Sequence, residues 1–479
     1  MGCPPGAGKF RSNGGLISMS RASGNTYEID MCSGAILPKL LQFTLPLMFS
    51  SILQLLFNAA DIIVVGHFAG DNALAAVGSN TSIINLLCNL FIGLSVGANI
   101  LAARQYGAGD REGLRQTVHT SILLSLLSGA LLAVVGVFGA GTILKIMQSP
   151  PGVRDLATLY LRIYFLGMPV TMLYNFGAAL LRAVGDTRRP LYYLLFAGVV
   201  NVVLNLFFVI ICSLGVVGVG LATVISQCIS AALVLRCMIR DTGAIHLDLW
   251  QLRIWPVRLK QIMQTGLPAG VQGILFALAN VVVQSSVNSF GEITVAGNAA
   301  ASNIETFIYT SMNAFYQANL SFTSQNFGAG QYRRICPILL RAEACVIVLG
   351  VVAGNLTVFF GPQLLSIYTD SPAVIAAGMN RISIICALYA LCGIMDVIVG
   401  SVRGIGYSVM PMLVSLVGAC GVRILTVATI FQIPAFHTIQ TIYWAYPVSW
   451  SVTFLAHLCC FLWAMRRLKL QSSDEKTTL

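Results

Sequence analysis

Asp61 is an acidic side chain within a long apolar stretch, and two amide side chains precede it at helical spacing. Gln54, Asn58 and Asp61 fall at positions i, i+4 and i+7, which is one face of an α-helix. A charge in a bilayer core costs roughly 2.5–3.5 kcal/mol on insertion scales, so such a carboxyl group needs polar partners or a wet cavity. This type of group can exchange a proton or bind a small cation.

Three further polar residues are expected at the same depth in neighbouring apolar stretches. Asn201 and Asn205 share a helical face at i, i+4, and Thr223 lies about two turns into the next stretch. With Asp61 they offer one carboxylate, two amide oxygens and one hydroxyl, which suit a small cation or a shared proton. We therefore predict a proton site or a candidate Na⁺ site at Asp61. H⁺ is favoured because the set carries a single formal charge. The alternative is simple hydrogen bonding between helices.

Twelve hydrophobic spans must position these residues. The 479-residue chain is 57% hydrophobic and 9% charged, with a mean hydropathy of +0.81. Soluble chains carry roughly 25% charged residues. Apolar stretches of about 20 residues are long enough to cross the hydrocarbon as helices. We predict an all-α membrane protein with spans at 37–66, 74–104, 114–144, 155–181, 191–212, 217–238, 260–289, 294–326, 335–361, 373–401, 409–432 and 440–465.

The spans form two related halves. Tyr106-Gly107-Ala108-Gly109 returns 221 residues later as Phe327-Gly328-Ala329-Gly330, and Arg182 to Pro190 returns as Arg403 to Pro411. Two similar helical halves suit a transporter in which one half rocks against the other around a central cavity. Asp61 has no acidic counterpart, because Val282 or Val283 stands at its repeat position. A structural need of the bundle should recur in both halves, so this asymmetry favours a functional role for Asp61.

The repeat and the composition also define the domain boundaries. We expect six-helix bundles at 36–240 and 260–466, joined by a linker at 241–259. The polar, Gly- and Ser-rich residues 1–35 are expected to form a disordered tail, and residues 467–479 a second tail.

The net charge of +11 invites a nucleic-acid interpretation, but the distribution of the basic residues excludes it. Most of the 28 Lys and Arg residues fall in the loops on one side of the predicted spans. The opposite side has only Lys145 and Arg154, with Arg162 close by. The positive-inside rule makes the basic side cytoplasmic. Both termini are therefore expected in the cytoplasm, with the chain in a bacterial inner membrane.

The second half has polar faces of its own. Polarity on a lipid-facing helix is costly, so we expect these faces, together with Gln54 and Asn58 of the first span, to line the substrate cavity. The residues are Asn280, Gln284 and Asn288 on the seventh span, Glu305, Tyr309, Asn313 and Gln317 on the eighth, and Asp396 on the tenth. Ordinary interhelical hydrogen bonding is the alternative, and Asp396 or Glu305 are candidates for a second ion site. Glu343 and Arg381 lie near span ends and are expected to reach the interface.

The order and duplication of these motifs resemble the multidrug and toxic compound extrusion (MATE) family over residues 36–466. The motifs are the two Gly-Ala-Gly turns, the two Arg-to-Pro segments and the first span from Leu45-Pro46 through Asp61 to Gly66. The resemblance implies two six-helix bundles with a V-shaped cavity, and export in exchange for Na⁺ or H⁺. It also implies a cation or proton site at Asp61 with polar partners on the fifth and sixth helices. The NorM branch uses a seventh-helix Glu, and this chain has no acid in that span.

The prediction is therefore a monomeric antiporter that exports organic, cationic or amphipathic compounds across the lipid bilayer. We expect no cofactor beyond the coupling ion, H⁺ or Na⁺. No His-Glu-x-x-His motif occurs, so we do not expect an enzyme. A flippase for a lipid-linked saccharide is the alternative function. Pro46 in the first span is a candidate hinge, because proline removes a backbone hydrogen bond, and a static kink is the alternative.

Overall fold

A computed structural model of the chain describes residues 27–147 and 151–477, and every regular element among them is helical. The first half contains α1 (Ile36–Phe68), α2 (Asp71–Ala108), α3 (Arg111–Ile146), α4 (Pro151–Leu166), α5 (Met168–Ala183), α6 (Arg188–Leu206), η1 (Phe207–Ile211) and α7 (Gly215–Arg240). The linker holds the short η2 (Leu249–Gln251). The second half contains α8 (Pro256–Asn288), α9 (Glu292–Gly328), α10 (Tyr332–Phe359), α11 (Gly361–Ser366), α12 (Pro372–Ile385), α13 (Ala390–Ile405), α14 (Val409–Ser415), η3 (Leu416–Gly421), α15 (Val422–Ala428), η4 (Ile430–Gln432), η5 (Pro434–Phe436) and α16 (Ile439–Thr477).

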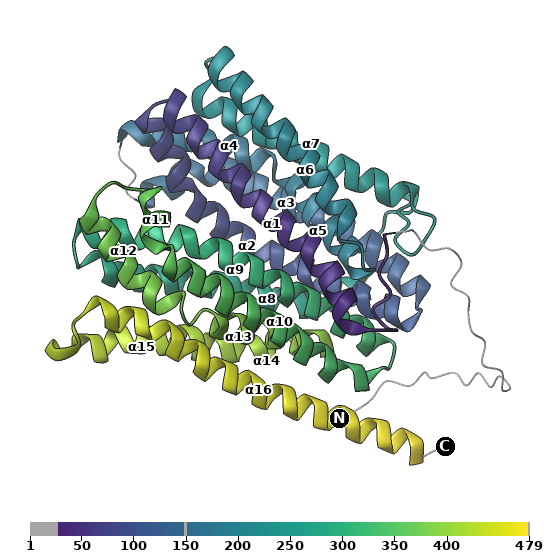
Figure 1. Cartoon of the computed structure of the whole chain (residues 1–479). Coiled ribbons are helices and arrows are strands. Elements are labelled where there is room, and N and C mark those ends of the chain that lie inside the picture. The colour runs from purple at the N-terminus through teal and green to yellow at the C-terminus, as the bar shows by residue number, and fades with distance from the viewer. Residues whose placement is uncertain (1–26, 148–150, 478–479) are drawn as a thin grey trace.

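The second half repeats the first at a constant offset. α2, α3, α4 and α6 begin at residues 71, 111, 151 and 188, and α9, α10, α12 and α14 begin at 292, 332, 372 and 409, which is 221 residues later each time. The fourth span of each half is bent, by 47° between α4 and α5 and by 49° between α12 and α13. The purple-to-teal helices and the green-to-yellow helices form the two bundles (Figure 1). The expected two-half, all-helical architecture is confirmed.

Eleven spans of the described residues meet the length and polarity expected of a membrane helix. Nine are single helical segments and two are the bent pairs. The remaining long helix, α9, has 37 residues and at 1.5 Å per residue measures roughly 55 Å. It is less apolar because Ser, Thr and Asn recur along its whole length, and most of those in its second half are buried. Those buried side chains lie between helices: Asn319 is 0% exposed and Nδ2 donates to Val397 O at 2.6 Å.

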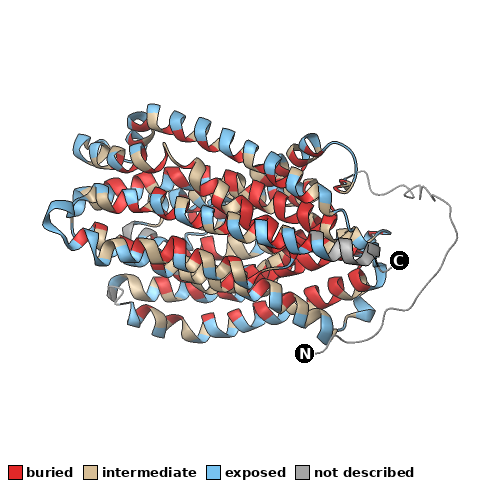
Figure 2. Cartoon of the chain, turned by 90° about the horizontal axis from the view of Figure 1, so that it is seen from below, coloured by how far each residue is buried: buried red, intermediate tan, exposed pale blue. Residues whose placement is uncertain are grey.

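The burial pattern shows which faces meet the lipid. Buried residues gather in the centre of the molecule, and exposed residues lie on the outward faces of the helices (Figure 2). Many of the exposed side chains are large and apolar, such as Phe138 at 80% exposure and Phe359 at 75%. Apolar outer faces of this extent suit a hydrocarbon environment.

The repeated Gly-Ala-Gly turns end one helix in each bundle and bring these two helices together. Gly109 and Gly330 have φ of +71° and +69°, a left-handed conformation that L side chains rarely adopt. A Cβ on Gly107 would lie 2.0 Å from Gln325 O, and a Cβ on Gly328 would lie 2.0 Å from Arg104 O. The first glycine of each motif therefore permits backbone contact between α2 and α9.

A second glycine-lined crossing joins the bundles, between α2 and α8. A Cβ on Gly93 would lie 2.2 Å from Gly270 N, and one on Gly97 would lie 2.7 Å from Gly266 Cα. Both helices thus present glycines four residues apart at the crossing, an arrangement that lets membrane helices approach closely.

Three expectations about the chain ends and the linker need correction. Residues 27–35 are not disordered: Ile29 and Met31 are 7% and 0% exposed, while residues 1–26 lie outside the described part. The composition of this segment gave no sign of burial, because the groove that receives it is made by distant helices. α8 begins at Pro256, inside the predicted linker, and α16 continues to Thr477, into the predicted second tail.

Pro46 lies inside α1, which continues as a helix across it. Proline cannot donate a backbone hydrogen bond to the preceding turn. Ser50 Oγ donates to Pro46 O at 2.9 Å, just after the proline. The position is compatible with a hinge or with a static kink, and the hinge stays a prediction.

Candidate functional site

Four polar residues expected to share a depth meet inside the first bundle. Asp61 on α1 is 8% exposed, and Asn205 and Asn201 on α6 are 1% and 5% exposed. Asn205 Nδ2 donates to Asp61 Oδ1 and also reaches Asn201 Oδ1 at 3.3 Å. Thr223 on α7 lies within hydrogen-bonding reach of the Asp61 carboxylate, and its hydroxyl donates to Val219 O at 2.9 Å. Three helices therefore converge on one buried carboxyl group.

An unused acceptor stands beside this carboxyl group. Asn205 Oδ1 is buried and has no hydrogen-bond partner among the residues that the structure describes. A protonated Asp61 would supply a donor for this oxygen, in a paired acid–amide arrangement with the Asn205 Nδ2 bond. A small cation could instead be ligated by the carboxylate and the amide oxygen. The donor set thus fits either a proton or Na⁺.

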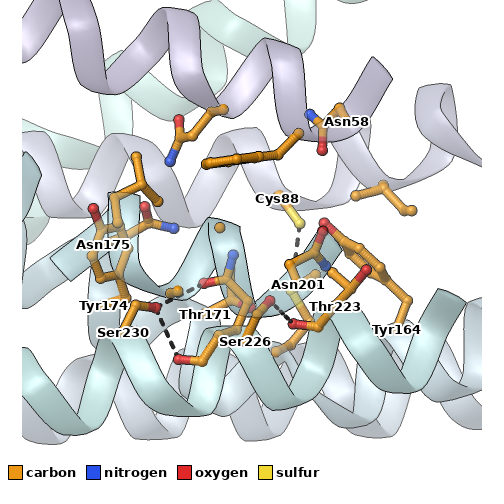
Figure 3. A pocket seen from close by; sticks show the side chains of 18 of the residues that line it. Asn58, Cys88, Tyr164, Thr171, Tyr174, Asn175, Asn201, Thr223, Ser226 and Ser230 are labelled. Carbon is orange, nitrogen blue, oxygen red and sulfur yellow. Dashed lines mark hydrogen bonds between the residues drawn. The ribbon is translucent and has the colours of Figure 1, made fainter. Parts of the chain in front are cut away.

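The carboxyl group borders a cavity of about 240 Å³ in the first bundle. Gln54 and Asn58 of α1 line it together with Asp61, as their helical spacing predicted. Figure 3 shows polar side chains from several helices around the space. Among the described residues of the lining, Asp61 is the one acidic side chain and there is no Lys or Arg. The cavity therefore offers hydrogen-bond groups and one negative charge to a small polar or cationic molecule.

Several lining residues were missed by the sequence interpretation. They are Asn85 of α2, Thr171 and Asn175 of α5, and Ser226, Gln227 and Ser230 of α7. Figure 3 labels Thr171, Asn175, Ser226 and Ser230 among them. Helical spacing could have identified these residues, because Thr171 and Asn175 are four residues apart and the α7 residues lie on the same helical face as Thr223. The signal was weak because Ser and Thr are common in membrane helices as backbone-bonded residues.

In the second bundle, Glu305 has a different role from the one expected. Arg381 Nε and Nη2 donate to the two carboxylate oxygens of Glu305 at 2.8 and 2.7 Å. Arg381 Nη1 donates to Asn298 Oδ1 at 2.8 Å, and Asn298 Nδ2 donates to Gln284 Oε1 at 3.0 Å. Arg381 is 8% exposed, so the expectation that it reaches the interface is wrong. Glu305, at 4% exposure, serves this ion pair and does not line the first-bundle cavity.

The other expected second-half residues stay apart from Asp61. Gln284 Nε2 donates to Asn288 Oδ1 at 2.9 Å, and Gln317 Nε2 donates to Asn313 Oδ1 at 3.0 Å. Tyr309 is 40% exposed. None of Asn280, Gln284, Asn288, Tyr309, Asn313, Gln317 and Asp396 lines the cavity beside Asp61. The structure therefore separates the two predicted polar sets into different bundles.

Asp396 has an acidic neighbour, Glu343, which the sequence predicted to extend to the membrane interface. The antiparallel packing of α10 and α13 brings Gly350 against Ala390 and Val346 against Gly393. The same register places Glu343 level with Asp396. Both carboxylate oxygens of Glu343 are buried and have no hydrogen-bond partner in the described part of the chain. Glu343 therefore does not extend to the interface as expected.

The family model of MatE matches this chain twice, at residues 46–207 and 268–429. Together the matches cover more than half of the chain. The chain belongs to the MatE family. Both ends of the two matched segments differ by 222 residues, so the family unit coincides with the structural repeat to within one residue. The MATE fold and the expected membership are thereby confirmed, and the chain is a multi-pass membrane transporter.

Two similar proteins come from Bacillus subtilis (strain 168). The probable multidrug resistance protein YoeA is 28% identical over 421 residues, covering 86% of this chain and 90% of YoeA. The probable multidrug resistance protein YpnP is 26% identical over 388 residues, covering 81% of this chain and 87% of YpnP. A multidrug resistance MATE transporter solved in an outward-facing conformation superposes with a TM-score of 0.86 at 21% identity. That match covers 94% of this chain and 100% of the other, and it supports the fold.

Proposed function

We propose that this MATE protein is an antiporter that exports organic, cationic or amphipathic compounds in exchange for H⁺. Its site is Asp61 with Asn201, Asn205 and Thr223. The observation that carries the proposal is the buried Asp61–Asn205 contact at the edge of a polar cavity, with Asn205 Oδ1 unused. Protonation of Asp61 removes its charge and provides a hydrogen bond to Asn205, so proton binding can alter how α1 and α6 hold the cavity.

Na⁺ is the alternative coupling ion. A Na⁺ site needs about five or six oxygen ligands, preferably with more than one negative charge. Asp61 supplies one formal charge, and the remaining oxygens near it are neutral. Asn205→Asp would add a second acid. If H⁺ alone couples transport, the variant shifts the pH dependence of efflux and creates no Na⁺ requirement.

The proposed orientation places the basic loops and both termini in the cytoplasm of a bacterium. Substrate would enter from the cytoplasm or inner leaflet and leave on the opposite side, with the protein acting as a monomer. Pro46 would let the Asp61 end of α1 move when the acid changes its protonation state.

Everted vesicles that contain the protein provide the test. A cationic dye is supplied with either a proton gradient or a Na⁺ gradient, imposed separately. Dye uptake driven by the proton gradient alone supports the proposal, and uptake driven by the Na⁺ gradient at fixed pH overturns the H⁺ assignment. Scrambling of a lipid-linked saccharide analogue without dye transport would support the flippase alternative. The described residues of the cavity lining include no Lys or Arg, which disfavours that alternative, because lipid-linked saccharides carry anionic phosphates.

A further inference from the structure

A short segment ahead of α1 connects the two bundles at the end that carries the Gly-Ala-Gly turns. It comprises residues 27–35 and is called the strap below. Ile29 and Met31 are 7% and 0% exposed, and Phe43, Phe322 and Ile335 belong to the same apolar cluster. Two apolar side chains of the strap are therefore packed inside the protein, although the segment has no regular secondary structure.

The strap is anchored to the first bundle at its beginning. Tyr106 Oη, at the end of α2, donates to Glu28 Oε2 at 3.0 Å. Gly185, between α5 and α6, is so close that a Cβ there would lie 2.5 Å from Ile29 O. The Arg189 guanidinium lies 5.8 Å from the centre of the Tyr27 ring.

The later part of the strap is anchored to the second bundle. Asn326 Nδ2, at the end of α9, donates to Met31 O at 3.0 Å. Arg334 Nη2, in the first turn of α10, donates to Ser33 O at 3.3 Å and to Gly34 O at 3.1 Å. Cys32 Sγ lies 4.0 Å from Gln325 Oε1. Nine residues of chain therefore bond to both bundles.

The strap lies on a seam where the bundles are in backbone contact. Gln325 Nε2 donates across the seam to Ala183 O at 2.7 Å. Arg104 Nη2 donates in the opposite direction, to Gly404 O at 3.0 Å. The strap partners Tyr106 and Asn326 flank the α2–α9 crossing at Gly107 and Gly328. Any separation of the bundles at this end must break these bonds and part the two anchors of the strap.

We propose that the strap is a latch that holds this end of the transporter closed and leaves the second bundle before this end opens. The inference rests on the proposed function, because only a transporter with alternating access must open this end. The anchors named above are hydrogen bonds, mostly to backbone carbonyls, one contact of a guanidinium with a ring, and two apolar side chains. Such a contact can be released and remade, whereas a longer helix docked across the seam would hold the bundles permanently.

Thiol labelling of Cys32 in the purified full-length protein tests the latch directly. Arg334→Ala removes the two bonds to the strap carbonyls, and Tyr106→Phe removes the bond to Glu28. Each variant is expected to raise the labelling rate of Cys32 roughly three- to tenfold, the effect of losing a charged or neutral hydrogen bond. Arg333→Ala removes a neighbouring exposed charge and should leave the rate unchanged. Equal rates in all four proteins, read by peptide mass spectrometry, would overturn the latch.

A reversible cross-link provides the second test. Gln325→Cys places a thiol opposite Cys32, so oxidation can join the strap to α9. The cross-linked protein is expected to lose dye transport in vesicles and to regain it after reduction. The matched control is Gln325→Cys combined with Cys32→Ser, which should ignore the oxidant. Unchanged transport by fully cross-linked protein would refute the latch while leaving the antiporter proposal intact. Failure of the wild type to transport any dye would refute the antiporter, and the labelling experiment would still decide whether the strap opens.

Discussion

Arg381 and Glu305 form a two-pronged ion pair in the interior of the second bundle, with donor–acceptor distances of 2.8 and 2.7 Å. Breaking such a pair leaves an uncompensated buried charge, which costs far more than replacing both partners by apolar groups. We expect Glu305→Ala to lower the free energy of unfolding by roughly 3–5 kcal/mol. Glu305→Leu combined with Arg381→Met should recover most of this loss. Denaturation in detergent measures both, and an equally unstable double variant would contradict the prediction.

The α2–α8 crossing should be intolerant of a single added methyl group. A Cβ on Gly93 would lie 2.2 Å from Gly270 N, so both backbones must move, at a cost of roughly 1–3 kcal/mol. Gly93→Ala is expected to lower the unfolding temperature in detergent and to slow transport. Gly78→Ala on the same helix is the control, because a Cβ there meets nothing within 4 Å. The prediction is wrong if both variants behave alike.

Asp61→Asn should leave folding intact and abolish coupled efflux. Asparagine has nearly the same shape and can still hydrogen-bond to Asn205, but it cannot exchange a proton and offers a cation no net charge. Dye transport in everted vesicles is expected to fall to the level of empty vesicles, with a normal expression level and elution profile. Asp370→Asn, in an exposed loop, should transport as the wild type does. Wild-type transport by Asp61→Asn would move the coupling site to Glu343 and Asp396.

The latch should loosen as pH rises. Burial raises the pKa of Glu28 above its ordinary value of 4.5, and nearby Asp241 and Asp186 raise it further, against the lowering effects of Tyr106 and Arg189. The carboxyl group of Glu28 therefore has a higher pKa in the docked strap than in a free strap. Docking is strongest below pH 4.5, the ordinary pKa, and weakens as the pH rises through the pKa of Glu28 in the docked strap. Cys32 labelling in the wild type, divided by that in Glu28→Gln, should increase with pH over this window. The ratio cancels the ionisation of the thiol itself, and a flat ratio would contradict the prediction.

Pro46→Ala tests the hinge in α1. Alanine restores a backbone donor toward the preceding turn and stiffens the helix. We expect slower dye transport with unchanged stability, and reduced solvent access at the far end of α1 as measured by hydrogen exchange. Leu45→Ala is a control at the neighbouring exposed position. Unchanged transport and exchange would identify a static kink.

The sequence predicted the parts of this structure that depend on local spacing and on the repeat. Gln54, Asn58 and Asp61 share a helical face in any helix, so their common cavity followed from position alone. The prediction that Asn201, Asn205 and Thr223 lie beside Asp61 followed from their similar depth in the membrane. That depth could be counted along each span, because each span begins near a membrane surface. The approximate positions of the helices followed from the lengths of the apolar stretches. The 221-residue offset followed from the repeated Gly-Ala-Gly turns, whose final glycines adopt a left-handed backbone conformation.

Contacts between distant segments could not be read in the same way. Arg381 lies near a span end, where a long basic side chain usually reaches water. Its partner Glu305 is 76 positions away in the chain, and only folding shows that the two meet. The burial of Met31 likewise depends on remote segments: it shares an apolar cluster with Phe322 and Ile335. Polar residues that pair with remote partners have the same local appearance as polar residues that face a cavity.

The glycine crossing of α2 and α8 makes α2 a lever with unequal arms. From the middle of Gly93 and Gly97 the helix extends about 12 residues to Gly107 and about 24 to Asp71, or roughly 18 and 36 Å. If the bundles pivot at this point of backbone contact, a parting of a few ångströms at the strap end produces about twice that travel at the opposite end. The contacts of the short strap would then control a much larger displacement at the opposite end of the transporter.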